Sequence, residues 1–205
     1  MIIHEVEQGT DSWFSLRAGI PTGSEFKKLV TSTGQPSKSM KEYAAQLAAD
    51  LYAGKPLDSF GGNQYTDRGS ELESEARKFY AFDSDCKVDE VGFITDDLKQ
   101  YGVSPDGLVG DDGLVEFKCQ IAKEHVKTLL YYYDKAKCPT AYIPQVQGQL
   151  FVTGRKWCDI CFYRPDLPAL IIRIEPDPVV IETLKKQLMA VIAERNLILK
   201  IINKY

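Results

Sequence analysis

The segment at residues 113–119, Gly-Leu-Val-Glu-Phe-Lys-Cys, limits what this chain can fold into more than any other. Strand periodicity places Glu116 and Lys118 on one face, beside Leu114, and leaves the opposite face wholly apolar. Two charges within an otherwise apolar strand raise the free energy of the folded chain unless they are exposed to solvent, paired with opposite charges or needed for function. The segment therefore predicts a strand with one apolar face and one face that carries an acid and a base.

Helical periodicity dominates the first third of the chain and returns later. Thr10 can cap a short helix, and Thr22 with Glu25 has the spacing of a capping box. A longer helix begins at Ser37 or Ser39 and stops before a Gly-Lys-Pro sequence. The expected helices cover about residues 10–17, 39–53, 65–80, 121–132, 144–152 and 178–202.

Strand periodicity appears in the middle of the chain and again after residue 156. The expected strands are residues 88–94, 113–119, 157–163 and 170–174, and the last two form a hairpin. A Ser-Pro-Asp-Gly turn at residues 104–107 separates the first two strands. These elements predict an α/β fold with a small mixed β-sheet flanked by helices, in one domain over residues 1–205.

Composition excludes several classes of protein. The chain has 205 residues, 44% hydrophobic and 26% charged, as expected for a soluble globular protein. Its formal net charge of −4 argues against a protein that coats nucleic acid non-specifically, although a nuclease with a local basic region stays possible. No apolar run approaches the roughly 18 residues that cross a bilayer, and the first residues lack the pattern of a secretory signal, so no membrane association is expected.

The five cysteines are an odd number without the spacing of a disulfide framework, which indicates reduced thiols in a cytoplasm. Cys158 and Cys161 form a CxxC motif, but residues three apart on a strand point to opposite faces. A zinc or iron–sulfur site would also need a second close pair. We therefore expect two buried thiols.

Asp106 and Glu116 are candidate metal ligands. Asp106 lies in the turn before the 113–119 strand, and a fold back through Gly107 can bring its carboxylate beside Glu116. Mg²⁺ and Mn²⁺ take carboxylate oxygens and leave coordination positions for a phosphate. Lys118 projects toward the same site, where its ammonium can orient or help deprotonate an attacking water. The alternative is a surface Glu–Lys pair on an edge strand, which contributes little to stability.

The same residues resemble the PD-(D/E)xK nuclease core, in the version of the phage lambda exonuclease and YqaJ-type viral recombinase family. The core resemblance rests on residues 104–107 (SPDG) and 116–119 (EFKC). Further stretches resemble that family in the same order, at residues 7–13 (EQGTDSW), 16–25 (LRAGIPTGSE), 69–76 (GSELESEA) and 145–147 (QVQ). The resemblance implies a restriction-endonuclease-like core, and it does not extend to residues 31–39 or beyond residue 163.

The resemblance also implies a role for individual residues. The catalytic set that it implies is Lys118, Glu116, Asp106, Glu73 and Gln145. The implied metal ligands are Asp106, Glu116, Glu73 and the backbone carbonyl of Phe117, around Mg²⁺ or Mn²⁺ with two ions per active site. Without the resemblance, Glu73 would be interpreted as one more exposed carboxylate.

Arg17 and Ser24 are implied to bind the phosphate at a 5′ DNA end, which suits a guanidinium and a hydroxyl. The residues alone leave a second interpretation of Arg17, as the partner of Asp11 or of a helix end. The implied protein is a metal-dependent, alkaline-type exonuclease. It would degrade the 5′-ended strand of linear double-stranded DNA and leave 3′ overhangs for phage-type recombination.

The resemblance further implies a homotrimer ring around DNA, a single-strand annealing protein as partner, and a bacterial cytoplasm as location. Two alternatives remain open. One is a RecB-like or CRISPR-adaptation-type nuclease, which usually brings a cysteine cluster. The other is a non-catalytic DNA-end-binding recombination scaffold, which would have lost the ligands.

Overall fold

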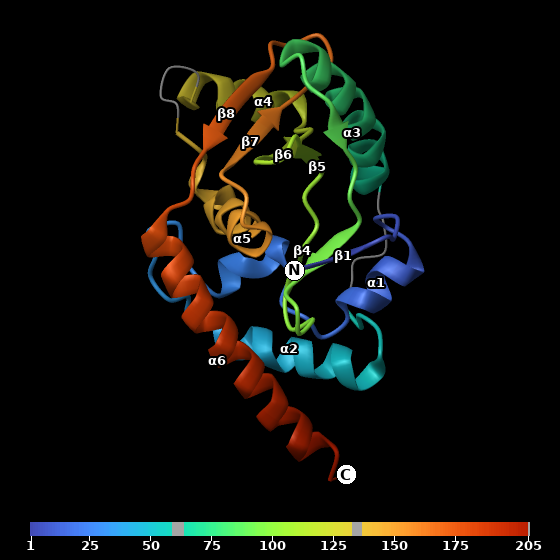
Figure 1. Ribbon diagram of the computed structural model, residues 1–205, viewed down its shortest axis with the longest axis vertical. Coiled ribbons are helices and arrows are strands. Elements are labelled where there is room, and N and C mark those ends of the chain that lie inside the picture. Colours follow the sequence, from blue (N-terminus) through green and yellow to red (C-terminus); the bar gives the residue numbers. More distant parts are fainter. Residues whose placement is uncertain (59–63, 133–136, 205) are drawn as a thin grey trace.

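The residues that the structure describes form two β-sheets (Figure 1). The computed structural model describes residues 1–58, 64–132 and 137–204. The smaller sheet has the strand order β1-β3-β4, and the larger has the order β2-β5-β6-β7-β8. The strands are β1 (Ile2–His4), β2 (Val88–Asp89), β3 (Phe93–Thr95), β4 (Gly102–Val103), β5 (Gly107–Val109), β6 (Gly113–Lys118), β7 (Trp157–Phe162) and β8 (Leu170–Ile174).

The larger sheet is mixed, as the sequence predicts. β6 pairs with β7 in parallel, with Glu116 opposite Ile160, while the other neighbouring strands are antiparallel. The helices are α1 (Asp11–Arg17), η1 (Gly23–Lys28), α2 (Met40–Ala53), α3 (Gln64–Asp83), α4 (Ala122–Tyr132), η2 (Thr140–Tyr142), α5 (Ile143–Thr153) and α6 (Pro178–Ile202). The bounds of α6 agree with the prediction, and Asp177 caps it by accepting hydrogen bonds from two backbone N–H groups.

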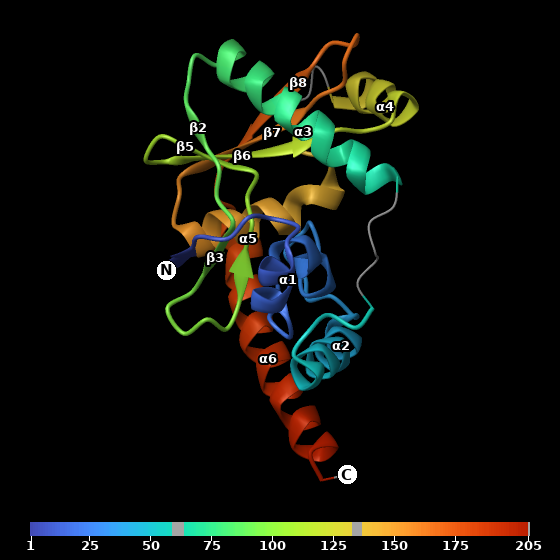
Figure 2. The ribbon, with the colours of Figure 1, turned by 90° about the vertical axis from the view of Figure 1, so that its right-hand side faces the viewer.

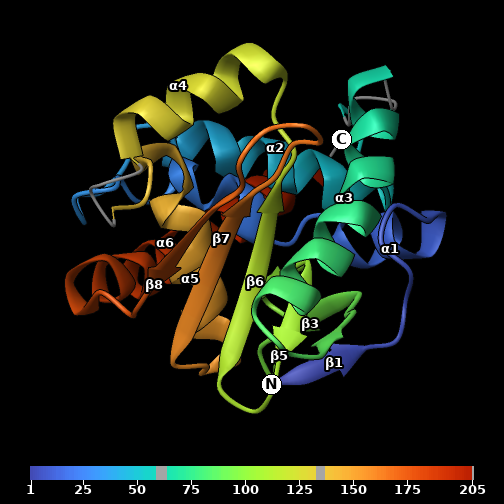
Figure 3. The ribbon, with the colours of Figure 1, turned by 90° about the horizontal axis from the view of Figure 1, so that it is seen from above.

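Helices α3 and α5 cover opposite faces of the larger sheet (Figures 2 and 3). Val115 and Phe117 pack in one apolar cluster with residues of α3. Leu114 packs in another with residues of α5. The predicted alternation along β6 is therefore confirmed, and Glu116 and Lys118 lie on the α5 side.

A third apolar cluster joins η1, α2 and α6 in the lower part of Figure 1. Phe26 of η1 and Leu184 of α6 are both fully buried there. Burial of each such side chain contributes about 1.5–3 kcal/mol. Tyr43 of α2 is also buried, and its hydroxyl accepts a hydrogen bond from the Thr22 N–H at 3.1 Å. The cluster also includes Val152 of α5, so it joins η1 to a helix that covers the larger sheet.

Two sequence expectations are wrong. Residues 88–94 do not form one strand, because β2 and β3 belong to different sheets. The chain changes sheet at Gly92, where any side chain would collide with the backbone carbonyl of Val6. The capping box at Thr22 is also absent, because η1 is a 3₁₀ helix and the Thr22 hydroxyl accepts a hydrogen bond from Arg17 instead.

The two cysteines of the CxxC motif are buried on opposite faces of β7, as expected from strand periodicity. Cys158 belongs to the cluster on the α5 side, and Cys161 to the cluster on the α3 side. Burial raises the pKa of Cys161 to about 12 and also raises that of Cys158. Both thiols are therefore protonated at neutral pH. Among the described residues, no helix is both long and apolar enough to span a membrane.

Candidate active site

The carboxylate of Glu116 is the centre of a buried polar cluster between β6 and α5. Glu116 is 3% exposed. Its Oε1 accepts hydrogen bonds from Lys118 Nζ at 2.7 Å and from Gln145 Nε2 at 2.5 Å. Its Oε2 accepts one from Gln149 Nε2 at 2.6 Å. The structure thus brings together three residues of the expected catalytic set, and the acid–base pair is not on the surface of an edge strand.

Asp106 lies beside this cluster, between β4 and β5. Its Oδ2 accepts a hydrogen bond from the Phe117 N–H at 2.6 Å, which ties the turn to the strand that carries Glu116. Burial raises the pKa of Asp106 well above its ordinary value, and the charges of Glu116 and Glu73 raise it further. The predicted fold back of this turn onto β6 is therefore confirmed.

Glu73 reaches the same region from α3. Its Oε1 is paired with Arg77 of the next helical turn at 2.9 Å. Arg77 also pairs with Glu90 at 2.8 Å and donates to the backbone carbonyl of Asp106 at 3.4 Å. Burial raises the pKa of Glu73, while Arg77 acts in the opposite direction and Glu116 adds to the rise. Glu73 is therefore more than an exposed surface carboxylate.

Lys118 remains a cation in this environment. Burial alone would lower its pKa, but the carboxylates of Glu116 and Asp106 outweigh that effect and raise the pKa. The ammonium also lies 3.4 Å from the Gln145 side-chain oxygen and 5.0 Å from the centre of the Tyr142 ring. In this arrangement Lys118 is a hydrogen-bond donor and a positive charge.

The donor set suits a hard divalent cation. Three carboxylates of like charge, Glu73, Asp106 and Glu116, lie close enough to raise the pKa values of Asp106 and Glu73, which is unfavourable unless a cation offsets them. Across residues 1–58, 64–132 and 137–204, no three His, Cys, Asp or Glu side chains already adopt a metal-holding arrangement. Glu73 and Glu116 are instead paired with cations of the chain, Arg77 and Lys118. A bound metal ion would therefore share these carboxylates with cations of the chain.

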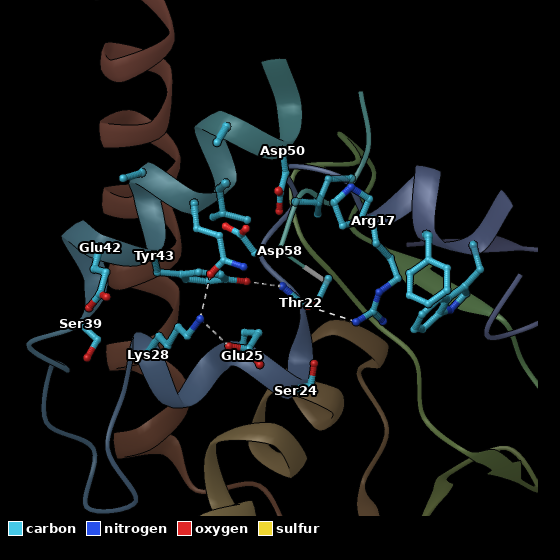
Figure 4. Close-up of a pocket in the computed structure, with 18 residues that line it drawn as sticks. Arg17, Thr22, Ser24, Glu25, Lys28, Ser39, Glu42, Tyr43, Asp50 and Asp58 are labelled. Atoms are coloured by element: carbon cyan, nitrogen blue, oxygen red, sulfur yellow. Dashed lines mark hydrogen bonds and ion pairs between the residues drawn. The ribbon is translucent and has the colours of Figure 1, made fainter. Parts of the chain in front are cut away.

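Arg17 and Ser24 line a separate cavity of about 880 Å³ between α1, η1 and α2 (Figure 4). The guanidinium of Arg17 lies 3.8 Å from the centre of the Trp13 ring, and it donates to the hydroxyls of Ser104 at 3.2 Å and Thr22 at 3.4 Å. Burial lowers the pKa of Arg17 to about 10, so the side chain is still protonated at neutral pH. Within the described part of the chain, the Arg17 guanidinium bonds to these two hydroxyls and not to Asp11.

Ser104 links Arg17, which lines the cavity, to the segment that carries Asp106. It precedes Asp106 by two residues. The Ser104 hydroxyl accepts hydrogen bonds from both Arg17 and the Trp13 ring N–H, the latter at 3.0 Å. Arg17, one of the two residues expected to bind a DNA end, therefore contacts the segment that carries a candidate metal ligand.

Residues 12–156 match the family described as the YqaJ-like viral recombinase domain. These residues make up more than half of the chain. The chain belongs to the YqaJ-like viral recombinase family. The resemblance found in the sequence is thereby confirmed. A comparison with curated protein sequences gave no match.

Solved structures place this YqaJ-like chain among phage-type exonuclease folds. An alkaline exonuclease, LHK-Exo, from Laribacter hongkongensis has 32% sequence identity and a TM-score of 0.81, over 95% of this chain and 97% of that chain. The same exonuclease in complex with dAMP matches with the same values. A phage related exonuclease from Haemophilus somnus 129PT matches with 15% identity and a TM-score of 0.67, over 89% of this chain and 96% of that chain, which supports the fold alone. The expected restriction-endonuclease-like α/β fold is confirmed.

Three residues of the site were not found from the sequence: Gln149, Arg77 and Ser104. Gln149 and Arg77 each follow a candidate site residue by four positions on a helix, which places them on the same helical face. That spacing indicates, from the sequence alone, that both side chains lie near the site. Ser104 belongs to the SPDG turn on which the core resemblance rests, but its contacts with α1 have no local signal in the sequence.

Proposed function

We propose that this protein is a metal-dependent exonuclease that degrades the 5′-ended strand of linear double-stranded DNA and leaves 3′ single-stranded overhangs. The observation that carries this proposal is the buried Glu116–Lys118 pair with Asp106 beside it, in a chain of the YqaJ-like family. The similarity to an alkaline exonuclease along nearly the whole chain supports it. The presence of Lys118 and all three carboxylates favours a nuclease over a non-catalytic DNA-end scaffold.

The proposed metal ligands are Glu73, Asp106, Glu116 and the backbone carbonyl of Phe117, for two Mg²⁺ or Mn²⁺ ions. Bound there, the ions would polarise the scissile phosphate and increase the acidity of a water nucleophile. Lys118 would hold that water or stabilise negative charge on the phosphate with its ammonium. Gln145 lines the same site.

In the proposed reaction Arg17 and Ser24 bind the 5′-terminal phosphate and thereby set which bond reaches the carboxylates. The half-buried guanidinium of Arg17 contacts Trp13 and Ser104, so it is already oriented before DNA arrives. Arginine is the preferred partner for a phosphate because its N–H groups match the phosphate oxygens. The dAMP complex of LHK-Exo is consistent with a family that releases deoxynucleoside monophosphates.

The proposal extends to one nuclease domain over residues 1–205, a homotrimer ring, an annealing protein as partner, and action in the cytoplasm of a bacterial host. A ring would give processivity by topology rather than by strong attraction to DNA. Such an arrangement suits a chain with a net charge of −4.

The function is tested on a linear duplex with a 5′ phosphate at one end only, with and without Mg²⁺. We expect mononucleotides to be released from the phosphorylated 5′ strand and the complementary strand to survive as a 3′ overhang. Chelation of the metal should stop the reaction. Release from the 3′ end, or cleavage of equal rate without any divalent cation, would contradict the proposal.

Arg17→Ala is expected to remove most of the preference for phosphorylated over hydroxyl 5′ ends. A charge-assisted contact of this kind contributes about 1.5–3 kcal/mol, or roughly ten- to a hundredfold in rate. Initial rates on the two substrates, for the wild type and the variant, form a double-mutant cycle with the phosphate as one partner. Equal slowing of both substrates would instead make Arg17 a structural or general DNA-backbone residue.

A further inference from the structure

Glu116 is held at both carboxylate oxygens by two glutamines of α5. Gln145 donates to Oε1 and Gln149 donates to Oε2, at 2.5 and 2.6 Å. The two glutamines are four residues apart on α5, so they lie on the same face of the helix. That face is turned toward β6, where Leu114 packs against Val146 and Leu150 in the same cluster. Two side chains of α5 therefore hold the Glu116 carboxylate of β6 through hydrogen bonds.

The two oxygens of the Glu116 carboxylate differ in how many of their acceptor positions are already used. An ionised carboxylate has about four lone-pair positions, two on each oxygen. The contacts with Gln145 and Lys118 use both positions of Oε1, whereas Gln149 uses one position of Oε2. The open acceptor position therefore belongs to Oε2. Gln149 holds the oxygen that is able to take a further ligand.

The orientation of Gln149 is itself fixed by its surroundings. Its side chain is 1% exposed, so water does not compete for its amide. The thiol of Cys158, on β7, lies 3.9 Å from Gln149 Oε1 and 3.8 Å from the Asp159 carbonyl oxygen, and it can donate its one proton to either acceptor. Burial raises the pKa of Cys158, which keeps the thiol protonated and able to donate. A reversed amide would lose this contact and would aim an oxygen at the Glu116 carboxylate.

We propose that Gln149 is a positioning residue for the metal site, because it fixes the Glu116 carboxylate in the orientation in which Oε2 accepts a divalent cation. This inference rests on the proposed function, since it takes Glu116 to be a metal ligand. Gln149 lies within residues 12–156, which match the family, but outside the QVQ stretch at residues 145–147 that carries the resemblance in this helix. Groups that hydrogen-bond a metal-ligating carboxylate typically change metal affinity or activity about 10- to 100-fold when they are removed.

The test compares Gln149→Met with Gln147→Met in the full-length protein, by calorimetric titration with Mn²⁺ in the absence of DNA. Methionine has nearly the length of glutamine but no donor. Gln147 is a matched control because it is also buried in α5, at 2% exposure, yet its amide bonds to the Glu175 carbonyl and the Asp177 N–H. Both substitutions therefore remove a buried amide, and only one of them removes a contact with Glu116.

We expect Gln149→Met to weaken Mn²⁺ binding by about 10- to 100-fold, while Gln147→Met keeps the wild-type affinity. The Mn²⁺ concentration that gives half-maximal cleavage should rise in parallel for Gln149→Met, with a smaller change in the rate at saturating Mn²⁺. If Gln149→Met does not fold, Gln149→Asn replaces it, because its amide is one methylene too short to reach Glu116. Thermal melts of each variant establish that the protein under test is folded.

Unchanged Mn²⁺ affinity in the Gln149 variant, or an equal loss in both glutamine variants, would overturn the positioning role. Glu116→Gln, titrated in the same way, separates this result from a failure of the proposed function. If Glu116→Gln binds Mn²⁺ like the wild type, the metal site itself is rejected, and the role of Gln149 with it. If Glu116→Gln loses Mn²⁺ while the Gln149 variant keeps it, only the role of Gln149 is rejected.

Discussion

Asp106→Asn is expected to abolish metal-dependent DNA cleavage, with a loss of roughly 10³-fold or more, while the fold is retained. The substitution would remove a charged ligand of the proposed metal site, and a ligand-held cation supplies several kcal/mol of transition-state stabilisation. The asparagine side-chain oxygen can still accept the Phe117 N–H bond that Asp106 accepts at 2.6 Å, so the turn keeps its tie to β6. Initial cleavage rates at saturating Mg²⁺ measure the effect.

The same substitution is expected to raise the melting temperature of the metal-free protein. Because burial and two neighbouring carboxylates raise the pKa of Asp106, its ionised form is less favourable in the folded chain than in the unfolded chain. The metal-free wild type therefore loses stability as the pH rises from the ordinary carboxyl range through the raised pKa. Asp106→Asn should lose less stability over that window.

Added Mn²⁺ supplies the control for this prediction. It should stabilise the wild type by mass action and stabilise Asp106→Asn much less. Wild-type cleavage by Asp106→Asn would reject Asp106 as a ligand. A variant that is inactive because it melts below the assay temperature would show instead that Asp106 is needed for folding.

The central strand and the helices around it were predictable because their signals are local. Glu116 and Lys118 stand two residues apart in an otherwise apolar strand, and the C-terminal helix has a capping Asp177 and a proline at its first position. The fold back of Asp106 onto Glu116 followed from the turn residues between β4 and β6. These features need no knowledge of distant contacts.

The wrong and missing elements depend on contacts far apart in the sequence. β1 is three residues long and pairs with β3, which lies about 90 residues later in the sequence. Such a short strand is not predicted by periodicity. The break at Gly92 between β2 and β3 is dictated by Val6, which packs against it from near the N-terminus. Sequence periodicity predicts a strand, but it does not say to which sheet each half belongs.

The candidate site also combines residues that have a local sequence signal with residues whose contacts are tertiary. Glu116 and Lys118 were expected on one face of a strand from spacing alone, and the structure places them in contact. Gln145 came from resemblance only, since the distance between α5 and β6 is a tertiary property. Gln149 shares a helical face with Gln145, which its spacing of four residues indicates, but its hydrogen bond to Glu116 is a tertiary contact that only the structure shows.

Lys118→Ala is expected to reduce the cleavage rate by about 10²–10⁴-fold, the usual scale for removal of a positioned proton-transfer or charge-stabilising group. The raised pKa of Lys118 keeps it protonated, so it donates to Glu116 and offers positive charge where a phosphate would develop negative charge. As a cation it is no metal ligand. Its loss also frees one acceptor position on Glu116 Oε1, so Mn²⁺ binding should be retained or become tighter.

Lys127→Ala is the matched control for Lys118→Ala, because Lys127 carries the same charge on the outer face of α4. Its ammonium pairs with Glu124 at 2.8 Å, and both side chains are about half exposed. A surface pair of this kind contributes little, so the control should cleave DNA and bind Mn²⁺ like the wild type. If Lys118→Ala lost Mn²⁺ affinity together with rate, the lysine would be needed to hold Glu116 in place. If it lost rate alone, Lys118 would act on the reacting groups, which is the role that its buried ammonium beside two carboxylates supports.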